Sequence, residues 1–134
     1  MTLQFSDDVR NARLDAIETA IGASPTLEIR SGAAPADCAQ ADSGVLLAQI
    51  ALPANWMADA LDAVKEKAGT WEDAAADANG TAGHYRIKDT GGNCHVQGTI
   101  TEFGAGGDME IDSTELLAGQ KFTVVSYQWT EGNA

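Results

Sequence analysis

Basic residues are scarce in this sequence. Its 134 residues include eight Lys and Arg against 20 Asp and Glu, which gives a formal net charge of −12. The basic residues are scattered, whereas a phosphate-binding surface needs them clustered so that they displace counterions. We therefore expect no nucleic acid among the partners. The acidity suits a surface that stays soluble at high local concentration or meets a basic partner, and it equally suits a generally acidic proteome.

Long apolar runs are missing too. The most apolar stretch, residues 45–61, is interrupted by Gln49, Pro53, Asn55 and Asp59, whereas a membrane-spanning helix needs about 20 apolar residues. The first eight residues have neither the basic start nor the apolar centre of a secretory signal. The sequence therefore predicts no membrane partner and folding in the cytoplasm.

Cysteine is nearly absent, with only Cys38 and Cys94 in separate segments. Two cysteines do not make a disulfide scaffold, and in a reducing compartment they act as small, half-buried hydrophobic residues. A bridge between them stays open at this point, because it requires Cα atoms within about 7 Å of each other.

What the sequence does contain is a clear β-hairpin over residues 83–100. Tyr85 and Ile87 alternate with polar neighbours, which is the period of a half-buried strand, and residues 89–93 have the glycines of a hairpin turn. After the turn, regular alternation predicts two faces. One carries Cys94, Val96, Gly98 and Ile100, and the other carries His95, Gln97, Thr99 and Thr101.

A helix is predicted ahead of the strands, over residues 6–21. Ser6 or Asp7 can cap its start, and Gly22 is typical of its end. Its apolar stripe consists of Val9, Leu14, Ile17 and Ile21, and the charged residues Arg10, Arg13, Asp15 and Glu18 are expected mostly on the opposite side.

Further strands are predicted at 26–30, 45–52, 69–71, 109–112 and 121–130, with 45–52 central because it is poor in charge. Residues 31–44 are expected to be a loop with little to bury, residues 72–83 an exposed connection, and 102–107 and 116–120 turns. Residues 55–67 favour a short helix, although Trp56 and Met57 could instead extend the preceding strand.

This pattern predicts a mainly β (α+β) fold, with a single N-terminal amphipathic helix followed by an antiparallel β-sandwich or small barrel. We expect a helical segment at residues 1–24 and one globular β unit at residues 25–134.

Templates for catalysis and metal binding fail. The sequence has no nucleophile elbow or P-loop, and residues 104–109 lack the third glycine of a dinucleotide fingerprint. Asp108, Glu110 and Asp112 are read as a solvated acidic face. Two Cys and two His are the ligands of structural zinc, but their spacing fits no zinc finger. We expect no enzyme, no cofactor and no metal.

Several segments nevertheless resemble one known family. They are residues 3–6 (LQFS), 9–18 (VRNARLDAIE), 32–38 (GAAPADC), 46–48, 51–53, 56–57, 80–87 (GTAGHYRI) and 94–98 (CHVQG). Together they resemble small proteins encoded among the virion morphogenesis genes of tailed bacteriophages and prophages. The likeness covers nearly the whole chain, and residues 9–18 are its most specific part. The chain departs from the family around residues 59–68.

The resemblance implies a non-enzymatic structural protein of the virion, assembled in the host cytoplasm. The specific role it suggests is capsid decoration (cement), as a homo-oligomer (a trimer or dimer) bound to the major capsid protein or other virion proteins. We expect the contacts to come from Phe5, Val9, Leu14, Ile17, Trp56 and Trp129.

Two alternatives stay open. One is a tail component, such as a tube, terminator or baseplate- or fibre-associated β domain. The other is a small ligand- or glycan-binding module, for which an acidic strand face beside exposed tryptophan would be the supporting feature.

Overall fold

The computed structural model describes residues 3–131, and one helix leads into a set of strands. Helix α1 spans Asp7–Ile21. The strands are β1 (Thr26–Ser31), β2 (Leu46–Ala51), β3 (Val64–Glu66), β4 (Trp71–Asp73), β5 (Gly80–Lys88), β6 (Cys94–Glu102), β7 (Met109–Ile111), β8 (Glu115–Leu116), β9 (Phe122–Val124) and β10 (Gln128–Thr130). The predicted mainly β class with a leading helix is confirmed.

The main sheet has the order β2-β1-β5-β6-β7, and β8 pairs with β5. The predicted hairpin is β5–β6, and it lies within this sheet. Pairing is antiparallel except between β6 and β7, which run parallel. The sheets stay open and do not close into a barrel.

Strand β2 lies at the edge of the main sheet, so its predicted central position is wrong. Its apolar residues Leu47 and Ile50 are buried in the core. The segment after β4 covers its outer edge. There the Asp77 N–H donates to Leu47 O (2.8 Å), and the Gln49 N–H donates to the Asp73 carboxylate (3.0 Å). An apolar composition therefore marks burial of the face, not a central place in the sheet.

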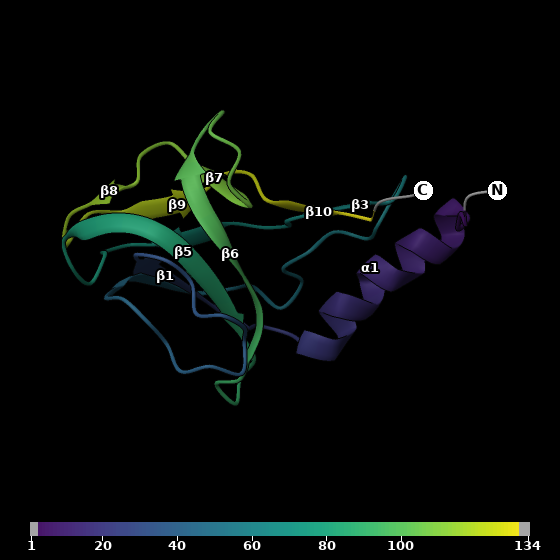
Figure 1. Cartoon of the computed structure of the whole chain (residues 1–134), viewed down its shortest axis with the longest axis horizontal. Coiled ribbons are helices and arrows are strands. Elements are labelled where there is room, and N and C mark those ends of the chain that lie inside the picture. Colours follow the sequence, from purple (N-terminus) through teal and green to yellow (C-terminus); the bar gives the residue numbers. More distant parts are fainter. Residues whose placement is uncertain (1–2, 132–134) are drawn as a thin grey trace.

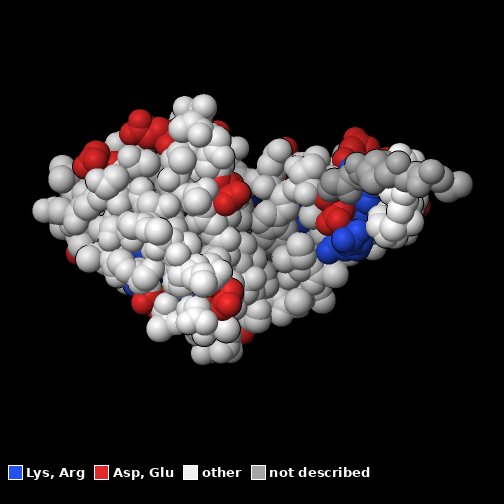
Figure 2. Space-filling model, viewed as in Figure 1, with Lys and Arg blue, Asp and Glu red and all other residues white. Residues whose placement is uncertain are grey.

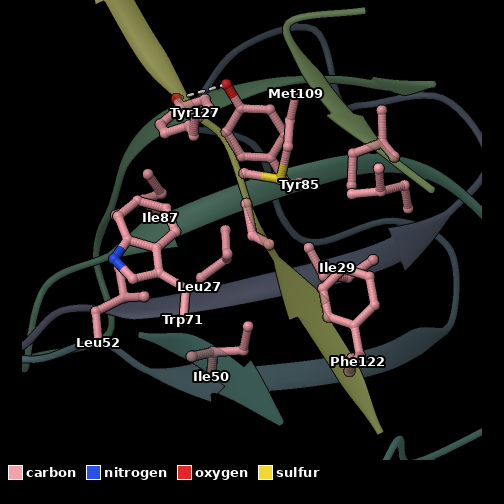
Figure 3. Packing of buried hydrophobic residues seen from close by; sticks show 14 of the residues in the cluster. Leu27, Ile29, Ile50, Leu52, Trp71, Tyr85, Ile87, Met109, Phe122 and Tyr127 are labelled. Carbon is pink, nitrogen blue, oxygen red and sulfur yellow. Dashed lines mark hydrogen bonds between the residues drawn. The ribbon is translucent and has the colours of Figure 1, made fainter. Parts of the chain in front are cut away.

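Two short ribbons, β4–β9 and β3–β10, accompany the main sheet. Residues of β4 and β9 contribute to one hydrophobic core with β1, β2 and β5. Figure 3 shows this packing, including Trp71, Phe122, Leu27, Ile29 and Ile50. The only polar link drawn inside it joins the Tyr85 and Tyr127 hydroxyls, 2.7 Å apart. Burial raises the pKa of both phenols, that of Tyr127 to about 12, so both stay neutral at ordinary pH.

Residues 55–67 form a tight hairpin, and the predicted helix there is wrong. Leu61 and Val64 exchange backbone hydrogen bonds of 2.9 and 3.0 Å across Asp62 and Ala63, whose φ angles are 52° and 59°. Two positive φ angles define a type I′ turn, the turn that matches the twist of paired strands. Trp56 is buried in the core. Tertiary contacts therefore outweigh the local helix propensity.

The predicted strand at 121–130 is divided in two by residues 125–127. Its first half, β9, pairs with β4, and its second half, β10, pairs with β3. Figure 1 shows the consequence: the ribbon β3–β10 extends away from the main sheet toward α1, which lies at the other end of the molecule. The division into units 1–24 and 25–134 stays a prediction. Within residues 3–131, no helix is long and apolar enough to cross a bilayer.

Candidate interaction surfaces

Helix α1 docks on the β3–β10 ribbon through a face that is only partly apolar. Ser6 caps it by accepting from the Val9 N–H (3.3 Å), and Gly22 (φ 93°) ends it, as predicted. Leu14 and Ile21 are buried, and Ile17 is partly buried against the core. These three confirm the inward side of the apolar stripe.

The charged side of the helix also faces inward, which the sequence analysis did not foresee. Lys65 of β3 is 1 % exposed. Its ammonium group donates to Asp15 (2.6 Å), Glu18 (2.8 Å) and Ala58 O (2.9 Å). Burial opposes the charge on Lys65, but the two carboxylates outweigh it and raise the pKa of Lys65. Asp15 and Glu18 are therefore docking residues.

The helix also binds the backbone of the hairpin turn. Asn11 Oδ1 accepts from the Ala63 N–H (2.8 Å), and Asp15 Oδ1 accepts from the Ala60 N–H (3.0 Å). Arg10 donates to Glu131 O just after β10. Such directional contacts fix the helix in one register on the ribbon.

The outer part of the N-terminal segment is apolar and exposed. Leu3, Phe5 and Val9 are 72 %, 40 % and 43 % exposed. We call these three residues the N-terminal apolar surface. The Arg13 guanidinium lies 5.2 Å from the centre of the Phe5 ring. This surface lies at the end of the molecule farthest from the main sheet (Figure 1).

The six residues expected to make contacts therefore divide. Phe5 and Val9 are exposed, whereas Leu14 and Trp56 are fully buried and offer no surface. Ile17 and Trp129 are partly buried against the core. Trp129 packs edge-on against Trp56, with ring centres 5.6 Å apart. The tryptophans belong to the interior, because Trp56 packs against Trp71 and Trp129 and these two rings pack against Tyr127.

A second set of contacts lies under residues 32–44, which we call the strap. As expected, none of its own residues is buried. The loop nevertheless covers the polar face of β5 and β6, which the sequence analysis did not foresee. Arg86, 2 % exposed, donates to the Asp42 carboxylate (2.6 Å). It also donates to three strap carbonyls, those of Asp37, Cys38 and Gln40, at 3.1–3.2 Å. A 13-residue loop without regular structure is tied down through its main chain.

Asp42 is the anionic centre of this region. One carboxylate oxygen accepts from Arg86, and the other contacts Lys88 (2.7 Å) and Arg30 (3.2 Å). Glu28 also pairs with Arg30 and Lys88. The hydrogen bond from Lys88, helped by Arg86 and Arg30, lowers the pKa of Asp42 to about 2. Three cations thus share two carboxylates.

Both cysteines lie at this strap. Ile87 pairs with Val96 and Lys88 pairs with Cys94, so the register shifts by one residue at the start of β6. This bulge turns Cys94 to the face of Lys88, and its predicted place on the face of Val96 is wrong. Cys38 and Cys94 line the same open cavity of about 600 Å³, together with Arg86 and Asp42.

The two histidines do not join the cysteines. His84 is buried and its Nδ1 lies 2.9 Å from Gly32 O, whereas His95 pairs with Asp89 (2.7 Å) at the hairpin turn. Asp108 accepts from the Thr99 N–H, and Glu110 accepts from the Gly106 N–H. In the part of the chain that the structure describes, no group of three or more His, Cys, Asp or Glu is placed to hold a metal ion.

A shallow groove of about 290 Å³ lies beside β8 and β9. Phe103 and Val125 line it with the buried residues Leu116 and Phe122, and Glu115 and Lys121 are among its polar residues. Its volume is at the lower end of the range for small-molecule sites.

The basic side chains interact mainly with other groups of the same chain. Seven of the eight form ion pairs with carboxylates: Arg10, Arg13, Arg30, Lys65, Arg86, Lys88 and Lys121. Lys67 donates to Gly69 O and lies over the Trp71 ring. With 20 acidic residues against eight basic ones, the charge left for the surface is negative. In Figure 2 most of the visible basic atoms lie near the helix, and acidic atoms form several separate groups on a face that is otherwise mostly uncharged.

No protein-family model, curated protein or solved structure matches the chain.

Proposed function

We propose that this chain is a non-enzymatic structural protein of a tailed-phage virion that decorates the outside of the capsid. The observation that carries the proposal is the N-terminal apolar surface. Leu3, Phe5 and Val9 are all exposed within a short stretch at the N-terminal end of an acidic chain. Clustered exposed apolar residues bordered by polar ones are typical of sites for protein partners.

The arrangement of the two ends supports this role. The helix is held on the ribbon by Lys65 and by Asn11, which leaves the other face of its first turn to a partner. The main sheet lies at the far end and projects away from that contact (Figure 1). The negative surface limits unspecific association between crowded copies.

The partner is the major capsid protein, and the chain binds it as a trimer or dimer. A small ligand is favoured less, because the groove beside β9 is of minimal size and the cavity of about 600 Å³ at the strap is open and lined by charged groups that already pair with one another.

The test uses capsids from the phage or prophage that encodes the chain, prepared without this protein. The wild-type chain and a Phe5→Ser/Val9→Ser variant are added to the capsids, and occupancy is measured by cryo-electron microscopy. We expect density at symmetry-related capsid positions for the wild type and a loss of at least tenfold in apparent affinity for the variant, since two buried apolar side chains contribute about 3 kcal/mol. Leu61→Ser is the matched control, because Leu61 is exposed at the hairpin turn and lies outside the N-terminal apolar surface.

Three results would contradict the proposal. Density along the tail would assign the chain to the tail. Equal binding by the Phe5→Ser/Val9→Ser variant and the wild type would remove the N-terminal apolar surface from the contact. Absence of binding to any part of the particle would exclude the virion role.

A further inference from the structure

The strap and the hairpin bring two half-buried thiols together. Cys38 belongs to the strap, and its carbonyl accepts a hydrogen bond from Arg86 of β5. Cys94 begins β6, and the bulge at Lys88 turns it toward the strap. The two cysteines line the same cavity. In sequence they are far apart, so their meeting is a product of the fold.

We propose that Cys38 and Cys94 form an intramolecular disulfide that locks the strap onto the β5–β6 hairpin when the protein meets an oxidant. The proposal does not depend on the virion role. Both thiols are half-buried at an open cavity, which gives small molecules access to them. A disulfide sulfur–sulfur bond is about 2.05 Å long, so the two cysteines that line this cavity must approach each other for the bond to form.

The oxidant is a low-molecular-weight disulfide such as oxidised glutathione. The Cys38 thiol loses its proton to solvent, and its thiolate attacks one sulfur of the oxidant, which releases one small thiolate. The Cys94 thiolate then attacks the Cys38 sulfur of the mixed disulfide and displaces the second small thiol. In total, two protein thiols become one disulfide and the oxidant becomes two thiols, so atoms and electrons balance.

The surroundings of Cys94 set the speed of this reaction. Burial and the neighbouring Cys38 thiol raise the pKa of Cys94 to about 12, and the Arg86 guanidinium opposes part of that rise. The thiolate is the reactive form, so the raised pKa of Cys94 slows the second, intramolecular step. The protein is therefore expected to fold in the reduced state and to be locked later. The rate should rise with pH well beyond pH 9.

The lock would hold a segment that is otherwise tied mainly by hydrogen bonds and ion pairs. A bond between residues 38 and 94 closes a long loop in the unfolded chain, and such bonds stabilise chiefly by restricting that state. We expect the oxidised protein to melt roughly 5–15 °C above the reduced protein.

The test equilibrates the full chain in reduced and oxidised glutathione at several ratios, with and without 6 M urea. Intact mass after acid quenching reports the loss of two hydrogens, and gel filtration reports the monomer fraction. We expect the native chain to become oxidised at a ratio of oxidised to reduced glutathione at least tenfold lower than the chain in urea. Cys38→Ser and Cys94→Ser are measured in parallel, and neither should gain melting temperature on oxidation.

Three outcomes would overturn the proposal. The first is that native and urea-containing samples become half oxidised at the same ratio of oxidised to reduced glutathione. The second is accumulation of stable glutathione adducts on each cysteine. The third is a disulfide that links two chains, in place of Cys38 and Cys94 of one chain. Cys38→Ser keeps the test valid if Cys94→Ser folds poorly, because Cys38 belongs to the strap and not to a strand.

Discussion

Two buried cations hold two different attachments in this protein. Lys65 of β3 binds helix α1, and Arg86 of β5 binds the strap. Both side chains are almost fully inaccessible to solvent. Their partners differ in kind. Lys65 contacts two side-chain carboxylates and one carbonyl, whereas Arg86 contacts one carboxylate, the Gln97 side chain and three main-chain carbonyls.

The two cations bind different groups because a helix and an irregular loop expose different hydrogen-bonding partners. A helix satisfies its own backbone, so a neighbour can bind its middle only through side chains. Asp15 and Glu18, three residues apart, lie on one face and converge on a single ammonium group. An irregular loop leaves its carbonyls unpaired, and the planar guanidinium with five donors can satisfy several of them at once. The strap therefore needs an arginine, and the helix can be held by a lysine.

The largest expected effect comes from Arg86→Met, which removes the cation but keeps an apolar stem. Three strap carbonyls would lose the Arg86 donor, and Asp42 would keep only Lys88 and Arg30 as cationic partners. Breaking a buried pair from one side costs about 3–5 kcal/mol, so we expect a loss of that size in the free energy of unfolding, measured by urea denaturation.

The matched control is Lys121→Met, because Lys121 forms an exposed ion pair with Glu72. It should leave the free energy of unfolding nearly unchanged, because solvent screens an exposed ion pair. A similar loss for the Arg86 and Lys121 variants would mean that the strap carbonyls are hydrated and that Arg86 does not hold the loop.

Lys65→Met should have a smaller and more local effect, about 2 kcal/mol. Asp15 and Glu18 are partly exposed and can be hydrated once the cation is lost. We expect amide hydrogens of α1 to exchange faster while those of β1 and β5 keep their protection, as measured by hydrogen exchange with mass spectrometry.

The two substitutions sharpen the comparison because they should release different segments. Arg86→Met is expected to expose the strap and leave α1 protected, and Lys65→Met the reverse. If either variant loosens α1 and the strap together, the two attachments are one cooperative unit and the comparison fails.

Features with local causes could be predicted from the sequence. The cap at Ser6, the end at Gly22 and the hairpin of β5 and β6 depend on residues next to each other. Strand β7 was also found from alternation, since Met109 and Ile111 are buried between polar neighbours. The exposed positions of Phe5 and Val9 agree with their expected availability, but their role as contacts stays a prediction.

The errors lie where distant segments decide the outcome. Residues 55–67 have helical composition, but the turn at Ala63 is bound by Asn11 of the helix. Alternation along β5 separates Arg86 from Tyr85 and Ile87, but it cannot show that a loop covers the face that carries Arg86. The bulge at Cys94 reverses a side chain without any signal in the residue pattern. The length of the 31–44 loop is a useful clue, since irregular loops of this size in a compact domain are often functional.

The smallest expected effect is on the free energy of unfolding at acidic pH and comes from Asp42. Its pKa in the folded protein is lowered from 3.8 to about 2, so its stabilising contribution is present above pH 4 and is lost as the pH falls toward 2. Asp42 is about one-third exposed, which reduces the contribution to about 1–2 kcal/mol. We expect wild-type stability to fall more steeply than that of Asp42→Asn between pH 4.5 and 2, in urea titrations at each pH.

Asp89 also has a lowered pKa, but it is present in both proteins and cancels in the difference. Asp59→Asn, at an exposed position, should follow the wild type. Parallel curves for wild type and Asp42→Asn would show that the strap does not depend on this carboxylate, and would leave the main-chain carbonyls as the only groups through which Arg86 holds it.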